Sequence, residues 1–398
     1  MLTPDFLLHI ADKMTLISDD IETYVLSEII KRLVARAERG EELMFTPYDK
    51  YQINALEESG KLYNDIVKKL SELSGEGIAE IKDALMEAGV TSIVNDALPL
   101  YRNGLPFDVL FPNIPMESIE HMDEVARILL NRSPAYIRIM EASYNATAGT
   151  FTNLVQTQAY ASRAEFVNAC DRAYWKAVSG SVSYTKAIQE EVQALKDNGI
   201  RAIQSEESGR WDKIDVAMAR ALRTGVSKMT AEITLARCKE LGIDTVLVDA
   251  HIGSRPEHEV WQGKIYSLSG TSDKYADFVE STGYGTGEGL CGWNCRHSFT
   301  PFMEGMSNPY ESAVDKEENE KRYALEQKQR YMERNIRKIK RDIELTKQEL
   351  SVVNTREERL KLNEQIKSQR EKLKACQNRY VQFCEENNLR VMSERLVA

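Results

Sequence analysis

Two stretches decide how this chain is organised: DAHIGSRPEHEVWQGKIYSLSG at residues 249–270 and STGYGTGEGLCGWNCRH at residues 281–297. Residues 249–305 hold nine of the 21 glycines and three of the five histidines. Just before them, residues 245–248 are β-branched and short, which favours a strand, and residues 266–268 favour a second one. We therefore predict a small Gly-rich α+β module over residues 244–309.

The sequence before this module carries mainly helical patterns. Apolar residues recur at helical spacing between residues 21 and 34, and the pattern ends before Gly40. A further helix is expected over 78–88, ending at Gly89, and four prolines between 99 and 115 favour an irregular connection. Helical patterns resume near Met116, and breaks at 133–134 and 208–210 divide them. The expected fold is mainly α, with an N-terminal helical region at 1–115 and a central one at 116–243.

The sequence after the module contains neither glycine nor proline beyond Pro309. Residues 316–352 follow one long helical pattern, and Thr355 with Glu358 has the spacing of a capping box that begins a second helix. Residues 310–398 are predicted to form two long helices folded as an antiparallel hairpin. A continuous coiled coil with a skip near residue 355 is the alternative.

Charge is unevenly distributed along the chain. The net charge of −10 argues against a protein that coats nucleic acid over its whole surface, but residues 321–380 carry a formal charge of +9 and the remainder −19. Five basic residues crowd about two helical turns. They are Arg334, Arg337, Lys338, Lys340 and Arg341. This cluster is a candidate contact for DNA phosphates, without sequence preference and with strong salt dependence; a solvated helical face is the alternative.

The Gly-rich module also gathers residues that could bind a metal. Cys291, Cys295 and His297 follow a C-x3-C-x-H pattern, and His258 or His251 could supply a fourth ligand. Thiolate and imidazole are the ligands zinc prefers, and a structural ion would stabilise a module with little core. The alternative is that these residues pack and form hydrogen bonds without a metal. Structural zinc is the one cofactor that the sequence suggests.

Other classes of protein fit the sequence poorly. Position 262 is Gln, so H-E-x-x-H is incomplete after His258 and Glu259, and deaminase and phosphate-loop motifs do not occur. No apolar run approaches the roughly 20 residues that span a bilayer, and the N-terminus lacks the pattern of a secretory signal. Six cysteines in so long a chain do not indicate a disulfide framework. We therefore expect no enzyme; the alternative is a metal-dependent, nuclease-like enzyme that uses the His/Cys cluster.

The two quoted stretches resemble the phage minor capsid protein 2 family, which is related to Mu F-like head-morphogenesis proteins. Those proteins share a D…R…H…G…N-C-R pattern. It falls here on Asp249, Arg255, His258, Gly263, Asn294, Cys295 and Arg296. The Mu F-like pattern commonly ends N-C-R-C, whereas this chain has His297, a change that retains a candidate zinc ligand. The resemblance covers most of the chain and is strongest from about 140 to 345.

The resemblance implies a structural, low-copy protein of a tailed phage that lies inside the head and associates with the portal. Such proteins enter the procapsid in the host cytoplasm during assembly and can act in DNA packaging or ejection. The implied partners are the portal and other capsid proteins, with the basic cluster facing acidic portal surfaces or packaged DNA. An adaptor built on a coiled coil, unrelated to phage, is a further alternative.

Overall fold

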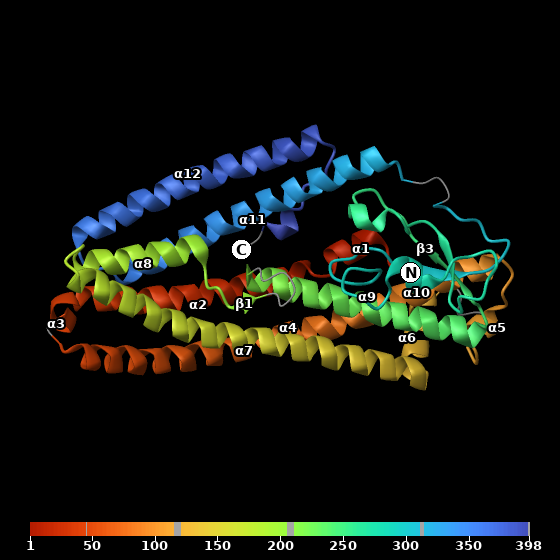
Figure 1. Ribbon diagram of the computed structural model, residues 1–398, viewed down its shortest axis with the longest axis horizontal. Coiled ribbons are helices and arrows are strands. Elements are labelled where there is room, and N and C mark those ends of the chain that lie inside the picture. Colours follow the sequence, from red (N-terminus) through yellow and green to blue (C-terminus); the bar gives the residue numbers. More distant parts are fainter. Residues whose placement is uncertain (45, 115–120, 205–210, 311–313, 397–398) are drawn as a thin grey trace. The chain divides into compact units, whose positions relative to one another are not determined.

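The computed structural model describes residues 1–44, 46–114, 121–204, 211–310 and 314–396 (Figure 1). The fold is mainly α, as predicted, with two small sheets. The helices are α1 (Pro4–His9), α2 (Asp12–Glu38), α3 (Gly40–Met44), α4 (Tyr48–Arg102), α5 (Phe107–Leu110), α6 (Met122–Arg132), α7 (Pro134–Val178), α8 (Tyr184–Asn198), α9 (Ile214–Leu241), α10 (Phe278–Thr282), α11 (Lys316–Val352) and α12 (Arg356–Glu386). The strands are β1 (Ile203–Gln204), β2 (Trp211–Asp212), β3 (Thr245–Val248), β4 (Ile265–Ser267) and β5 (Phe299–Phe302). None of the helices in these ranges is both long and apolar enough to span a bilayer.

The chain forms two compact units, each assembled from three separate segments. Unit 1 comprises Met1–Lys13, Ile78–Thr150 and Ala219–Lys328. Unit 2 comprises Met14–Gly77, Phe151–Met218 and Gln329–Ala398. The division into four regions at residues 115, 243 and 309 stays a prediction.

Helix α4 continues through two residues that the sequence suggested would end it. Gly89 lies inside the helix, where an added Cβ would come within 3.1 Å of Leu130 Cδ1. The absence of a side chain at Gly89 thus lets Leu130 pack closely against α4, and the weak helix propensity of glycine does not end the helix. Pro99 also lies inside α4. The irregular connection expected from 99 therefore begins only after Arg102; Met116 lies outside the described residues.

Helix α9 is one continuous helix from Ile214 to Leu241, within the region expected to be helical after the break at 208–210. Gly225 lies near its middle, and a Cβ there would collide with Thr147 Oγ1 on α7. Trp211 and Asp212 are not helical but form β2, which pairs with β1 in antiparallel register. The helix ends at Leu241, and Gly242, directly after it, adopts φ 67, in the left-handed region that favours glycine. The break predicted at 208–210 lies outside the described residues.

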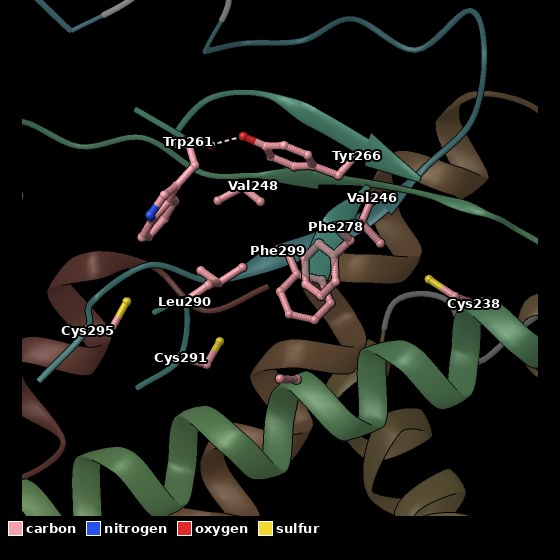
Figure 2. Packing of buried hydrophobic residues seen from close by; sticks show 11 residues of the cluster. Cys238, Val246, Val248, Trp261, Tyr266, Phe278, Leu290, Cys291, Cys295 and Phe299 are labelled. Atoms are coloured by element: carbon pink, nitrogen blue, oxygen red, sulfur yellow. Dashed lines mark hydrogen bonds between the residues drawn. The ribbon is translucent and has the colours of Figure 1, made fainter. Parts of the chain in front are cut away.

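A three-stranded antiparallel sheet forms the base of the Gly-rich module. Its order is β4-β3-β5, so the predicted strand at 245–248 lies in the centre, and β5 was not predicted. Figure 2 shows side chains of the sheet and its loops packed against α9. The buried cluster comprises Ala231, Cys238, Val246, Val248, Trp261, Tyr266, Phe278, Leu290, Cys291, Cys295 and Phe299. The module therefore shares its apolar core with a long helix.

The antiparallel hairpin predicted for the C-terminal region is confirmed in unit 2. Helices α11 and α12 run side by side (blue in Figure 1), and residues far apart in sequence meet in antiparallel order. Gln329 Nε2 lies 3.4 Å from the Tyr380 hydroxyl, and Gln369 Nε2 lies 3.3 Å from Thr346 Oγ1. Thr355 is the N-cap of α12, as its spacing to Glu358 predicted.

Candidate metal centre in the Gly-rich module

The first residue of the family pattern, Asp249, lies directly after the central strand β3. Its carboxylate accepts hydrogen bonds from the backbone N–H of Ser298 at 3.1 Å and from the Ser298 hydroxyl at 3.3 Å. The Asp249 carbonyl accepts a hydrogen bond from Gly263 N. This bond links the end of β3 to the end of the loop that precedes β4. Burial raises the pKa of Asp249 to about 8, although the Ser298 hydrogen bonds oppose that shift. Asp249 is thus a buried link between the segment at Gly263 and the segment at Ser298.

Two further residues of the family pattern hold loop backbone in place. Arg255 donates to the Trp293 carbonyl at 2.8 Å. Gly263 adopts φ 70, and an added Cβ would come within 3.1 Å of the Tyr310 carbonyl oxygen. A side chain at this position would therefore be strained and crowded, and glycine is the residue that fits.

Asn294 and Arg296 flank Cys295 and anchor the same turn. Asn294 adopts φ 53, in the left-handed region, and its Oδ1 accepts from Arg223 on α9 at 3.0 Å. Arg296 donates to the Gly253 carbonyl at 2.7 Å and pairs with Glu326 at 3.0 Å. Both side chains therefore position the turn that carries Cys295.

Three of the predicted metal ligands meet inside the module. One ligand atom from each of His258, Cys295 and His297 lies within 4.8 Å of the others, and all three residues are buried. Cys295 Sγ lies 3.9 Å from His258 Nδ1 and 3.7 Å from His297 Nδ1. A thiol and two imidazole nitrogens therefore face one another.

The far nitrogen of each imidazole has its own oxygen partner. His258 Nε2 lies 3.0 Å from the Glu288 carbonyl oxygen, and His297 Nε2 lies 3.0 Å from Gln262 Oε1. Oxygen acceptors require a proton on each Nε2, so the Nδ1 atoms of the neutral rings carry the lone pairs. Burial lowers the pKa of both histidines and raises the pKa of Cys295 to about 11.

The remaining two candidate ligands lie outside this group. Cys291 is fully buried and adopts φ 60, but its thiol is directed to the His297 carbonyl at 3.8 Å. The His251 ring stacks on His297 with centroids 4.4 Å apart. The structure thus brings together three of the four predicted ligands.

Segments of the loop between α10 and β5 pack backbone against backbone, because glycines stand at the points of contact. A Cβ on Gly289 would collide with the Gly283 carbonyl, and one on Gly292 would collide with the Gly287 carbonyl. A Cβ on Gly287 would lie 2.6 Å from the Trp293 ring. This packing places Cys291 and Cys295 in the core beneath the loop, as labelled in Figure 2.

Sequence reasoning missed two residues that organise the module. Asn319, at the start of α11, is fully buried and accepts from Gly253 N at 2.7 Å and Ser254 N at 2.9 Å. Its amide nitrogen donates to Glu259 Oε1 at 2.6 Å. Gln262 Oε1 accepts a hydrogen bond from the backbone N–H of His251 and another from His297 Nε2. Neither residue belongs to a motif, and Asn319 lies some 60 residues from its partners.

The five basic residues predicted to contact DNA or the portal do not share one exposed face. Arg337 and Arg341 are buried and pair with carboxylates of unit 2, among them Asp19. Lys340 donates to the Leu396 carbonyl. Arg334 is exposed, and Lys338 is partly exposed beside Asp197. The predicted five-residue contact is therefore corrected, because two of its members are committed to internal ion pairs.

Comparison with known proteins places these features in a family. The chain matches the family model described as phage minor capsid protein 2 over residues 2–385. The chain belongs to the phage minor capsid protein 2 family. The resemblance seen at residues 249–297 is thereby confirmed, and membership gives the chain a structural role in the phage capsid.

A structural protein of Lactococcus phage LL-H is also similar to this family member. The two are 22% identical over 182 residues, which make up 42% of this chain and 49% of that protein. The chain thus spans about half the length of the curated relative that it matches. No solved structure matches the chain.

Proposed function

We propose that this minor capsid protein lies inside the phage head, associates with the portal and acts in capsid assembly and in DNA packaging or ejection. The observation that carries the proposal is the family match over residues 2–385. The similarity to a phage structural protein agrees with a place in the virion. The proposed partners are the portal and other capsid proteins.

An apolar stripe on α4 supports a protein partner. Within unit 2, Ile53, Leu56, Gly60, Tyr63 and Val67 follow alternating spacings of three and four residues. Ile53 is 56% exposed, Leu56 49% and Val67 41%. Gly60 and Tyr63 are partly buried, and the Tyr63 ring packs against Tyr160, but the three exposed side chains are suited to packing against a helix of another protein.

Co-purification of the full chain with portal rings tests this proposal. We expect the wild-type chain to elute with the portal and the double variant Ile53→Ser, Leu56→Ser to elute separately, because the stripe loses its apolar side chains. Glu57→Ser with Lys61→Ser is the matched control, since both positions are exposed on the same helix. Failure of the wild-type chain to bind portal, or equal binding by all three proteins, contradicts the proposed contact.

The buried placement of the His/Cys group supports a structural role over catalysis. His258 is 2% exposed, and Cys295 and His297 are each 1% exposed. A nuclease must bring a phosphate to its reacting groups, and these side chains lie beneath the loop surface. We expect no cleavage of plasmid DNA by the protein supplied with Zn²⁺, and turnover that is lost in His258→Ala while the fold persists would favour the enzyme.

Contact with packaged DNA is a second candidate function, favoured by the exposed basic residues of the hairpin. On α12 these include Lys361, Lys367, Arg370, Lys372, Lys374 and Arg379. Filter binding of the full chain across a salt series should show affinity that falls steeply as salt rises. Lys367→Gln with Lys374→Gln should flatten this dependence. Absent or salt-independent binding would remove the DNA role.

A further inference from the structure

We propose that the module holds one Zn²⁺ ion through His258 Nδ1, Cys295 Sγ and His297 Nδ1, with the fourth position left to a small non-protein ligand. This site goes beyond the proposed assembly role. It concerns the stability of the module, so the zinc site and the assembly role can be disproved separately.

The spacing of the three atoms suits a tetrahedral ion. Zinc bonds of about 2.3 Å to sulfur and about 2.0 Å to nitrogen place the sulfur and nitrogen about 3.5 Å apart at a tetrahedral angle. The corresponding distances here are 3.9 Å to His258 and 3.7 Å to His297. A shift of a few tenths of an ångström therefore brings each imidazole nitrogen to the tetrahedral distance from the sulfur, and the ligand atoms of the group lie within 4.8 Å of one another.

The surroundings of the two imidazoles carry the argument further. Histidines that bind metal usually donate their other ring N–H to an oxygen acceptor, which sets the tautomer and the ring orientation. Glu288 O and Gln262 Oε1 fill that role for His258 and His297, each at 3.0 Å. Two separate oxygen acceptors thus turn both Nδ1 lone pairs toward the same sulfur.

The choice of metal follows from the donor atoms. One thiolate with two imidazoles suits zinc, whereas magnesium and calcium prefer oxygen ligands. Binding would release the thiol proton of Cys295 to solvent, leaving a thiolate as the anionic ligand. Since the module's loops are joined mainly by hydrogen bonds, an ion that links residues 258, 295 and 297 would stabilise them.

Metal analysis of the purified full-length protein tests the site. We expect about one zinc per chain in wild type and loss of most of that zinc in Cys295→Ser and in His258→Ala. Cys291→Ser is the matched control, because it makes the same change at an equally buried cysteine of the same loop whose thiol lies outside the group. It should retain the zinc.

Cobalt substitution reports the ligands directly. After chelation and addition of Co²⁺, wild type and Cys291→Ser should show the visible bands of tetrahedral cobalt and a thiolate charge-transfer band, whereas Cys295→Ser should lose the latter. Chelation should also lower the melting temperature of wild type more than that of Cys295→Ser. Metal-free wild type that fails to bind Zn²⁺ or Co²⁺, or zinc retained in Cys295→Ser, overturns the site. Zinc lost in Cys291→Ser overturns the three-ligand assignment.

Discussion

Single buried polar residues hold the loops of the module by bonding to several backbone groups at once. Asn319 accepts hydrogen bonds from the backbone N–H groups of Gly253 and Ser254 and donates one to the Glu259 carboxylate. Asp249 accepts from the backbone N–H and the hydroxyl of Ser298. Removing such a side chain leaves more than one buried group without its partner. The cost therefore exceeds that of one ordinary hydrogen bond.

Replacing Asn319 by alanine should expose this dependence. We expect Asn319→Ala to lower the free energy of unfolding by about 2–4 kcal/mol, because two loop amides lose their acceptor. Urea denaturation followed by circular dichroism measures it. Asn363→Ala is the control, since Asn363 is exposed and its amide donates to the Arg359 carbonyl of its own helix. Equal losses in the two variants would contradict the assigned role of Asn319.

At this scale the sequence predicts residues whose chemistry is distinctive. Cysteine and histidine in a short pattern indicated His258, Cys295 and His297, and the structure places them together. It also suggested Cys291, which a spacing alone cannot exclude, because the direction of a thiol depends on the loop conformation. Asn319 and Gln262 were missed because amides are common and their partners are distant in sequence.

At the scale of elements, glycines inside helices have opposite roles depending on their neighbours. Gly225 in α9 faces Thr147 on α7, whereas Gly149 in α7 has open space around its Cα. Both lie in unit 1. The two positions therefore respond differently to the same added methyl group.

Alanine substitution at these two glycines should change stability in opposite directions. Gly225→Ala should destabilise by about 1–3 kcal/mol, because the methyl group collides with a buried threonine. Gly149→Ala should stabilise by up to about 1 kcal/mol through higher helix propensity. Thermal unfolding of both variants checks this, and a stabilised Gly225→Ala would show that α7 and α9 are not in close contact.

A buried cluster of charges joins α2, α9 and α11 within unit 2. Arg337 pairs with Asp19 at 2.9 Å and with Asp215 at 3.2 Å, and Arg341 pairs with Glu22. Burial and, to a smaller extent, the neighbouring Asp215 raise the pKa of Asp19 to about 7, although Arg337 and Arg341 oppose that shift. Because this pKa lies above its ordinary value, the stabilising contribution of Asp19 is present at low pH and is lost as pH rises toward 7.

Removing Arg337 should therefore have a pH-dependent effect. Arg337→Ala leaves buried carboxylates without a cation and should cost about 3–5 kcal/mol at pH 8. The loss should be smaller at pH 5, where a protonated Asp19 needs no cation. Denaturant unfolding at the two pH values measures the difference, with the exposed Arg334→Ala as control. A loss that is the same at both values would contradict the role of Asp19.

Elements were predicted where local patterns and packing agree. The hairpin, the long α7 and the strand at 245–248 follow from hydrophobic spacing and caps in the sequence. Gly89 and Pro99 were taken as a helix end and a break, since a local pattern cannot show that a neighbouring helix contacts the glycine. The strand β5, with Pro301 within it, carries too weak a pattern to be predicted.

At the scale of the whole molecule, the uneven charge has a measurable consequence. The chain carries −10 overall with a sequence pI of about 5.3, although residues 321–380 carry +9. We expect solubility to be lowest near pH 5.3, where repulsion between copies vanishes. Light scattering across pH measures this, and added salt should reduce the association because it screens opposite charges. A minimum well away from that pH would contradict this expectation.

The glycine loop at 283–292 also limits how this protein can change. Backbone atoms contact backbone atoms directly in this loop, so it has no space for a larger side chain or for one extra residue. A saturation library scored for folded protein should therefore be nearly empty at Gly289 and Gly292, while the open Gly60 and Gly149 accept many replacements. Engineers who wish to graft a tag or a label should choose the helices and leave this loop untouched.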